Sequence, residues 1–295
     1  METLEHCTVC LSDNISPLMD CADHFVTNES FSIQRCNACS FCFTSPRPEE
    51  KDVGQYYESI EYISHSKTQK GLVNRLFHLS RNYTINYKKK LVKKYSSGNS
   101  ILDYGCGTGD FLHAMSSSGW DCFGIEPNKK ARDIALSKGN IKAWHENMLD
   151  EIPDNSFHAI TLWHVLEHIY PLNDRLRSFY RLLDEKGMLF VALPNMQSSD
   201  ALRYGPYWAA WDVPRHIHHF NPETIVKLMY RYGFQLMDTR PLFLDAFYIS
   251  LLSEKYKSGK SKFPIAMFHG LQSNLHAFFG NGNYSSLIYI FKKSE

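Results

Sequence analysis

The first residues that could do chemistry are four cysteines near the N-terminus. Cys7 and Cys10 form one C-x-x-C pair, and Cys36 and Cys39 form another. Two such pairs supply four thiolates, the ligand set of a structural zinc ion whose coordination is closed to substrate. The segment between the pairs exceeds the usual spacer of ~15–20 residues, but a longer loop adds little closure entropy. The pattern predicts a small zinc ribbon, with a redox C-x-x-C or reduced core cysteines as alternatives.

Two further cysteines in this segment are not expected to bind zinc. Cys42 lies between two phenylalanines, which is typical of a buried strand position, and Cys21 has no partner at C-x-x-C spacing. Segments of fewer than about 40 residues rarely fold without a metal, so zinc would hold this one as a rigid cap or as a module that recognises a partner. An RNA-binding ribbon is the alternative. The lysines between positions 88 and 94 would help it, but their apolar neighbours indicate an ordinary amphipathic helix.

A glycine-rich stretch is the second candidate site. Gly105, Gly107 and Gly109 follow an apolar run that contains Asp103 and precede a helical pattern. Glycine lets the backbone approach a ligand closely, and a helix begins with free N–H groups. The dehydrogenase fingerprint G-x-G-x-x-G would need glycine where Asp110 stands, and no Gly-Lys-Ser/Thr follows for a P-loop. The stretch therefore predicts a nucleotide site of another type.

A carboxylate at the end of the next expected strand completes this signature. Glu126 is the last residue of the strand-like run 121–126. A carboxylate in this place can accept hydrogen bonds from both hydroxyls of a ribose, as in adenosine-binding α/β folds. A capping role for Asp103 and a surface position for Glu126 are the alternatives. Because both acids stand in register with the glycine loop, we favour cofactor binding.

Histidines form the third candidate group. His164 follows the expected strand 159–163, and His168 lies four residues further on. Ligands of α/β sheets bind beyond the carboxyl ends of strands, so we expect these side chains, or those of a later loop, to meet the substrate. The candidates in that later loop are Arg215, His216, His218 and His219. Aromatic packing before a helix capped by Asn221 is the alternative, and a catalytic metal in this loop is disfavoured.

The elements that must position these residues alternate between strands and helices. Strand-like runs lie at 100–104, 121–126, 159–163 and 188–193, with helical stretches at 129–138 and 172–183 between them. This alternation predicts an α/β fold with a parallel sheet covered on both faces. A further helical stretch at 74–95 ends at a breaker near residue 97. We therefore predict a zinc-ribbon-like segment at 1–48, a helical connector at 49–97 and the α/β domain at 98–295.

Composition limits the classes of protein that remain. The chain has 295 residues, of which 43% are hydrophobic and 21% charged, and this excludes a disordered, collagen-like or coiled-coil protein. A net charge of +1 provides no overall attraction for nucleic acid. The N-terminus lacks a signal-peptide pattern, and no apolar run approaches the ~20 residues of a membrane span. We expect a cytoplasmic protein.

With these motifs, the chain resembles the class I S-adenosylmethionine-dependent methyltransferases. Their glycine motif reads like LDYGCGTGDF, and their second strand ends in an acid as at Glu126. The resemblance covers about 98–240, with 287–292 as a last strand. It implies a Rossmann-like, mostly parallel seven-stranded sheet and S-adenosyl-L-methionine as cofactor. It also implies adenine contacts near Asn147 and Met148, with His164 at the edge of the cofactor cleft. His158 stands where the family usually has aspartate.

A cysteine ribbon before such a core resembles a subset with some sugar C-methyltransferases and proteins near the ubiquinone-pathway O-methyltransferases. The Asn/Asp-Pro-Pro-aromatic motif of nucleic-acid amino-methylating enzymes is absent, which makes nucleic acid an unlikely partner. The resemblance implies methyl transfer to a small-molecule acceptor, with oxygen favoured. C-methylation of a nucleotide-linked sugar, or an inactive protein that docks a partner through the ribbon, remain as alternatives. For 243–282 we expect a lid or a homodimer surface, and for the tyrosines near 57 and 62 we favour packing over a roof on the site.

Overall fold

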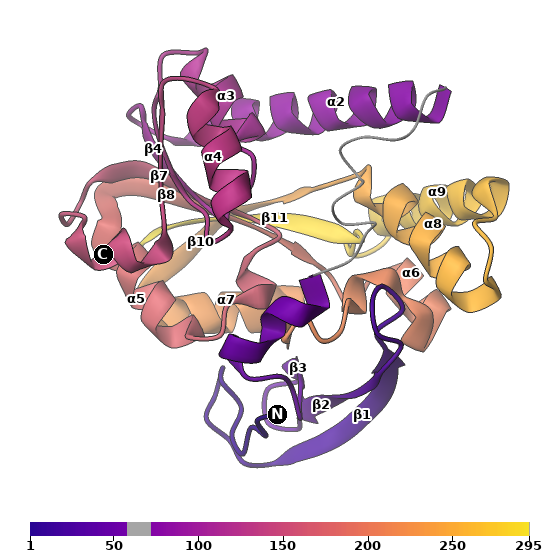
Figure 1. The fold of residues 1–295 in the computed structure, drawn as a ribbon. Coiled ribbons are helices and arrows are strands. Elements are labelled where there is room, and N and C mark those ends of the chain that lie inside the picture. Colours follow the sequence, from indigo (N-terminus) through magenta and orange to yellow (C-terminus); the bar gives the residue numbers. More distant parts are fainter. Residues whose placement is uncertain (58–71, 295) are drawn as a thin grey trace.

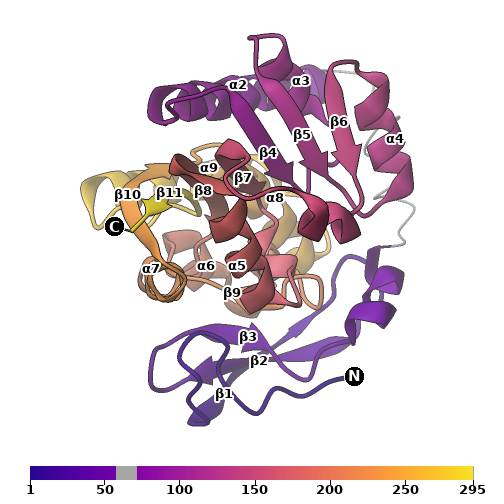
Figure 2. The same ribbon diagram turned by 90° about the vertical axis from the view of Figure 1, so that its left-hand side faces the viewer.

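The centre of the molecule is a seven-stranded sheet in the order β10-β11-β8-β7-β4-β5-β6 (Figures 1 and 2). The computed structural model describes residues 1–57 and 72–294, so the predicted aromatic patch at 62–66 lies outside the described residues. Neighbouring strands from β6 to β8 are parallel, whereas β11 runs antiparallel to both β8 and β10. The strands are β4 (Ser100–Tyr104), β5 (Asp121–Ile125), β6 (Ile141–Trp144), β7 (Phe157–Trp163), β8 (Leu183–Pro194), β10 (Phe234–Pro241) and β11 (Ser286–Lys293). The predicted mostly parallel seven-stranded sheet is confirmed.

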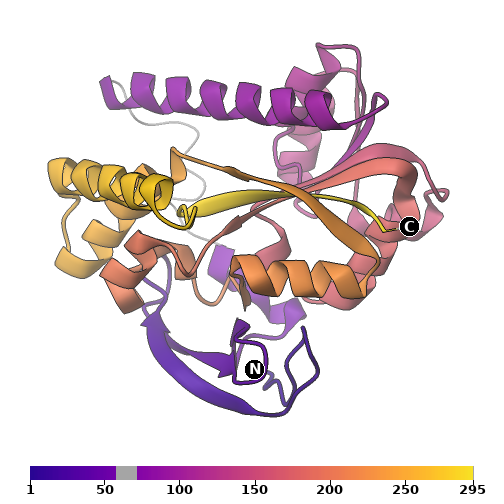
Figure 3. The same cartoon turned by 180° about the vertical axis from the view of Figure 1, so that it is seen from behind.

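Helices cover both faces of this sheet, as predicted. Figure 3 shows α2 (Leu72–Tyr95) above the sheet and α7 (Pro222–Arg231) below it. Successive strand residues point to opposite faces, so neighbouring residues of β4 belong to different cores. Ile101 packs with Leu91 of α2, whereas Leu102 belongs to the core that contains Phe179 of α5 (Leu172–Leu182). The remaining helices of the α2 face are α3 (Asp110–Ser116) and α4 (Lys129–Ser137).

Helix α7 begins directly after the loop that carries Arg215, His216, His218 and His219, which we call the histidine-rich loop. The side chain of Asn221 accepts a hydrogen bond from the backbone N–H of Thr224, and the Thr224 hydroxyl accepts one from the N–H of Asn221. This reciprocal capping satisfies N–H groups that have no partner within the helix. Pro222 occupies the first turn, where its missing N–H costs nothing. The predicted helix start at Asn221 is confirmed.

The N-terminal segment forms a small antiparallel sheet in the order β1-β2-β3-β9. β1 (Ile15–Ala22), β2 (Ser30–Cys36) and β3 (Cys42–Thr44) come from the segment itself, and the short helix η1 (Glu50–Tyr57) follows. The fourth strand, β9 (His218–His219), comes from the histidine-rich loop of the α/β domain and pairs with β3. The ribbon is therefore joined to the loop by backbone hydrogen bonds.

A helical hairpin lies between the last two strands of the large sheet. α8 (Asp245–Ser258) and α9 (Phe263–Phe279) pack together and against α6 (Ser199–Tyr204) (Figure 1). Several apolar side chains of α9 are exposed, namely Ile265, Phe268, Leu271, Leu275, Phe278 and Phe279. A lid or dimer surface here stays a prediction. Among the described residues, no helix combines the length and apolar character needed to cross a bilayer.

Candidate functional site

The glycine loop lies between β4 and α3, at the carboxyl end of β4, which stands between β7 and β5 in the sheet. Gly105, Gly107 and Gly109 have φ angles of 75°, 54° and 73°, in the left-handed region that favours glycine. A Cβ at Gly105 would stand 2.6 Å from a methyl group of Val165, and one at Gly109 would stand 2.8 Å from Cβ of Ala135. At Gly107, by contrast, no described atom lies within 4 Å of that position. The outer two glycines serve packing, and the middle one leaves room for a ligand.

Glu126 lies directly after β5, beside this loop. Its Oε2 accepts a hydrogen bond from the Gly107 N–H and its Oε1 accepts one from the Asn128 N–H, both at 2.9 Å. The residue is only 9% exposed, and this burial raises the pKa of its carboxyl, against the opposing effect of the two N–H groups. Each carboxylate oxygen has a second lone pair. The carboxylate can therefore bind ribose hydroxyls while it holds the loop.

Asp103 is the penultimate residue of β4 and is buried below the loop. The Thr161 hydroxyl donates a hydrogen bond of 2.6 Å to its Oδ1. Burial raises the pKa of Asp103 to about 7, against the opposing effects of the Thr161 hydrogen bond and the positive charge of Lys88. A carboxyl that is poised near neutrality can attract a cationic ligand in its ionised form.

The two predicted adenine contacts lie on η2 (Glu146–Glu151), which follows β6. Asn147 is exposed, and its side chain is 3.1 Å from Nδ1 of His145. Met148 lines a surface groove of ≈ 460 Å³ together with Phe123 and Trp144. Their contact with adenine stays a prediction.

His164 lies at the carboxyl end of β7, in a left-handed conformation with φ 60° that is uncommon for a residue other than glycine. Its Nε2 is 3.0 Å from Oδ2 of Asp245, the first residue of α8, and its Nδ1 is 3.5 Å from Oε1 of Glu167. Burial lowers the pKa of His164, but the two carboxylates outweigh it and raise the pKa to about 9. The imidazole therefore carries a positive charge at neutral pH, which a general base must not.

Arg215 is buried and contacts residues of three different segments. Its Nη2 is 2.9 Å from Oδ1 of Asp23 in the ribbon and 2.7 Å from Oδ1 of Asp212. Its Nη1 donates a hydrogen bond of 2.9 Å to the carbonyl of Tyr56. These contacts occupy the guanidinium and give Arg215 a clear positioning task, while its predicted catalytic role stays untested.

The three histidines of the same loop have different surroundings. His218 Nε2 donates a hydrogen bond of 3.0 Å to the carbonyl of Ile169, and His219 Nε2 is 3.0 Å from the Thr44 hydroxyl. Burial lowers the pKa of His218 to about 3 and lowers that of His219 as well, so both are neutral. His216 differs, because only its Nδ1 is hydrogen-bonded, at 2.8 Å to the carbonyl of Ala210. Its Nε2 faces Glu167.

The structure brings His164 and His216 together through a residue that the sequence analysis did not select. Glu167 Oε1 lies 3.5 Å from Nδ1 of His164 and 3.9 Å from Nε2 of His216. Glu167 also lines a small cavity of ≈ 10 Å³ with His216, His218 and His219. The signal that could have found it is the spacing H-x-x-E-H at 164–168, which places an acid between two histidines.

The four predicted zinc ligands lie together in the ribbon. Their sulfur atoms are all within 4.8 Å of one another. The Sγ atoms of Cys7 and Cys39 are 3.6 Å apart, and those of Cys10 and Cys36 are 3.5 Å apart. A tetrahedral zinc ion with Zn–S bonds of ~2.3 Å requires sulfur atoms ~3.8 Å apart, so the set fits the metal. Cys21 and Cys42 are not part of this group.

Comparison with known proteins gives one family and one curated relative. Residues 78–239 match the family described as "Methyltransferase domain". A ubiquinone biosynthesis O-methyltransferase from Pseudomonas paraeruginosa is 30% identical over 107 residues. The match covers 34% of this chain and 46% of the relative, so the chain spans about half the length of the curated protein that it matches.

Solved structures with the same fold include two S-adenosylmethionine-dependent methyltransferases. The one from Archaeoglobus fulgidus has a TM-score of 0.52 at 18% identity and covers 80% of this chain and 100% of its own. The one from Thermotoga maritima has a TM-score of 0.51 at 18% identity and covers 75% of this chain and 96% of its own. The [4+2]-cyclase SpnF has a TM-score of 0.50 at 16% identity, covering 70% and 80%, so the fold also occurs in a cyclase. Because the family match spans more than half of its residues, the chain belongs to the methyltransferase domain family.

Proposed function

We propose that the protein transfers a methyl group from S-adenosyl-L-methionine to an oxygen atom of a small molecule. The observation that carries this proposal is the cradle formed by Asp103, the loop around Gly107 and Glu126. It lies at the carboxyl ends of two adjacent parallel strands, β4 and β5. This edge is where open α/β sheets bind their ligands.

The residues of this cradle have separable tasks. Glu126 accepts hydrogen bonds from ribose hydroxyls, and Gly107 lets the backbone approach the ligand, because no described atom lies within 4 Å of where its Cβ would stand. Asp103 provides negative charge for the cationic end of the cofactor. When bound, S-adenosyl-L-methionine supplies a methyl group that its sulfonium already activates. The main task of the protein is then alignment, which can contribute ~7–11 kcal/mol to lowering a barrier.

The acceptor would meet the cofactor beside the carboxyl end of β7. His164 lies there, with Glu167 and His216 next to it. Oxygen is the favoured acceptor atom because the curated relative is an O-methyltransferase, although the match covers only 46% of it. C-methylation of a nucleotide-linked sugar remains the second candidate.

For the ribbon we propose a structural zinc ion held by Cys7, Cys10, Cys36 and Cys39, in line with their sulfur separations. The strand pairing of β3 with β9 supports a role of the ribbon as a cap beside the histidine-rich loop. A docking role for it, a homodimer and a cytoplasmic location remain predictions.

Calorimetric titration with S-adenosyl-L-methionine tests the cofactor site. We expect saturable binding by the wild type and at least tenfold weaker binding by Glu126→Ala, because each hydrogen bond to a charged group contributes about 1.5–3 kcal/mol. Asp133→Ala, an exposed acid on α4, is the matched control and should bind as the wild type does. Absence of binding at millimolar ligand would contradict the enzyme proposal and favour the inactive binding protein.

A further inference from the structure

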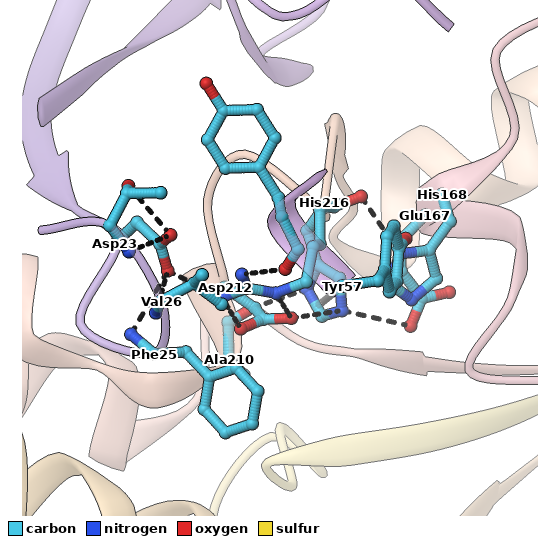
Figure 4. A network of polar contacts seen from close by, with 12 residues as sticks. Asp23, Phe25, Val26, Tyr57, Glu167, His168, Ala210, Asp212 and His216 are labelled. Atoms are coloured by element: carbon cyan, nitrogen blue, oxygen red, sulfur yellow. Dashed lines mark hydrogen bonds and ion pairs between the residues drawn. The ribbon is translucent and has the colours of Figure 1, made fainter. Parts of the chain in front are cut away.

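Three side chains near the proposed acceptor position face one another without forming hydrogen bonds among themselves. They are Glu167 and His168 of η3 (Leu166–His168), which follows β7, and His216 of the histidine-rich loop. One carboxylate oxygen and one nitrogen of each imidazole all lie within 4.8 Å of one another. Figure 4 shows the three side chains beside one another.

Hydrogen bonds to backbone carbonyls define which nitrogen of each imidazole carries hydrogen. A carbonyl can only accept, so Nδ1 of His168, 2.9 Å from the carbonyl of Arg215, must be the donor. The Tyr57 hydroxyl, 3.0 Å from the same Nδ1, then accepts a hydrogen bond from it. By the same reasoning, Nδ1 of His216 donates to the carbonyl of Ala210 at 2.8 Å. In their neutral form both histidines therefore keep the lone pair on Nε2, as metal-binding histidines do when a carbonyl fixes their tautomer.

Glu167 supplies the negative charge of the group. It is 1% exposed, and neither carboxylate oxygen has a hydrogen-bond partner among the described residues. Its Oε1 lies 3.5 Å from Nδ1 of His164 and 3.9 Å from Nε2 of His216. Buried charges are normally paired with hydrogen-bonding partners or coordinate a metal, because desolvation without compensation is costly.

Neighbouring charged groups also have other partners, although His164 faces Glu167 with its Nδ1 at 3.5 Å. His164 directs its Nε2 to Asp245 at 3.0 Å. Asp212 lies 3.9 Å from Nε2 of His216 but binds the guanidinium of Arg215 at 2.7 Å. Among the described residues of this region, Glu167, His168 and His216 thus remain as a group of possible ligands whose atoms lie within 4.8 Å of one another.

We propose that Glu167, His168 and His216 bind one divalent transition-metal ion. Two imidazoles and one carboxylate form a ligand set that suits Fe²⁺, Mn²⁺, Co²⁺ or Zn²⁺ and leaves coordination positions open. Nitrogen and oxygen atoms bound to one such ion at ~2.1 Å lie ~3.0–3.4 Å apart, so the three side chains, whose ligand atoms lie within 4.8 Å of one another, move closer together when they bind it. An oxygen of the methyl acceptor can take an open position. That last point rests on the proposed function, whereas the metal site does not.

Binding of Mn²⁺ alone, followed by electron paramagnetic resonance, tests the site. The protein is used with zinc in the ribbon, because thiolates select zinc and leave Mn²⁺ to report on nitrogen and oxygen ligands. We expect one Mn²⁺ per chain in the wild type and at least tenfold weaker binding in Glu167→Gln and His216→Ala. His113→Ala, an exposed histidine of α3, should bind Mn²⁺ as the wild type does.

Thermal unfolding provides a second readout that also checks folding. Mn²⁺ should raise the Tm of the wild type, because a ligand of the native state stabilises it, but not that of Glu167→Gln. Glu167→Gln preserves side-chain volume, so it carries the test if His216→Ala fails to fold. Wild-type protein that binds no Mn²⁺ up to 1 mM, or a folded Glu167→Gln that binds it equally, would overturn the proposal. Calorimetric titration with S-adenosyl-L-methionine measures cofactor binding independently of Mn²⁺ binding. Failure of the metal site can therefore be distinguished from failure of the cofactor site.

Discussion

The two acids beside the glycine loop show how burial changes the pKa of a side chain whose type alone is known from the sequence. Asp103 and Glu126 are both acids beside the glycine loop, but Asp103 is almost fully enclosed and Glu126 is held by two backbone N–H groups. Burial raises the pKa of Asp103 to about 7. Near neutral pH this carboxyl can gain or lose its proton on ligand binding.

A pH dependence of stability follows from Asp103. Its folded pKa lies above the value of ~3.9 expected in the unfolded chain, so between about pH 4 and 7 the unfolded state releases a proton that the folded state keeps. Unfolding is then favoured as pH rises, by up to ~1.4 kcal/mol per pH unit, and the effect levels off above pH 7. Asp103→Asn should remove this contribution and gain stability relative to the wild type across that window.

Urea unfolding at a series of pH values measures the difference. Asp121→Asn, at an exposed position that begins β5, is the control and should follow the wild-type pH profile. Parallel profiles for Asp103→Asn and the wild type would show that Asp103 ionises in the folded protein as it does in the unfolded chain.

The histidine-rich loop is the element that joins the two sheets. Arg215 within it contacts Asp23, which is fully buried and also accepts hydrogen bonds from backbone N–H groups of its own turn. A buried ion pair that loses one partner typically destabilises by about 3–5 kcal/mol, because a charge is left uncompensated. The loop therefore depends on the guanidinium for its attachment to the ribbon.

Arg215→Ala should accordingly lower the free energy of unfolding by about 3 kcal/mol. Arg203→Ala removes an exposed arginine on α6 that bonds the Gln272 side chain, and it should cost far less. Denaturant unfolding of the two variants beside the wild type measures the contrast. Equal stability of both variants would show that the buried pair contributes no more than a surface contact.

At the scale of the whole molecule, the ribbon and the methyltransferase domain both contribute strands to the small four-stranded sheet. β9 of the domain pairs with β3 of the ribbon, and Arg231 of α7 donates a hydrogen bond to the carbonyl of Val9, between Cys7 and Cys10. Structural zinc couples strongly to folding, because the unfolded chain lacks a formed site. Loss of the metal should therefore reach the histidine-rich loop.

Removal of zinc tests this coupling. Cys36→Ser, or a zinc chelator, should lower the Tm of the main unfolding transition of the whole chain. Calorimetry of the full-length protein measures it, with Cys122→Ser, a buried cysteine of β5 outside the group, as the control for loss of a core thiol. A main transition unchanged by chelation would show that the ribbon folds independently of the domain.

The sequence by itself determined the features that depend on neighbouring residues. The alternation of strands and helices, the glycine loop, the acid at the end of β5 and the paired cysteines are all local patterns, because each needs only the periodicity of one element or the geometry of one turn. They were sufficient to predict the class of fold and the gathering of the four cysteines.

Only the tertiary structure decided how the histidine-rich loop is used. A strand as short as β9 has no periodicity, so its pairing with β3 cannot be recognised along the chain. The partners of Arg215 and the meeting of Glu167 with His216 likewise involve residues far apart in sequence. The burial of these side chains depends on such long-range contacts. Those contacts distinguish Arg215, whose guanidinium is paired, from His216, whose Nε2 forms no hydrogen bond among the described residues. The sequence alone therefore predicts catalytic roles for the whole histidine-rich loop. In the structure, Arg215 of this loop holds the ribbon through Asp23, whereas His216 lies beside Glu167 in the candidate metal site.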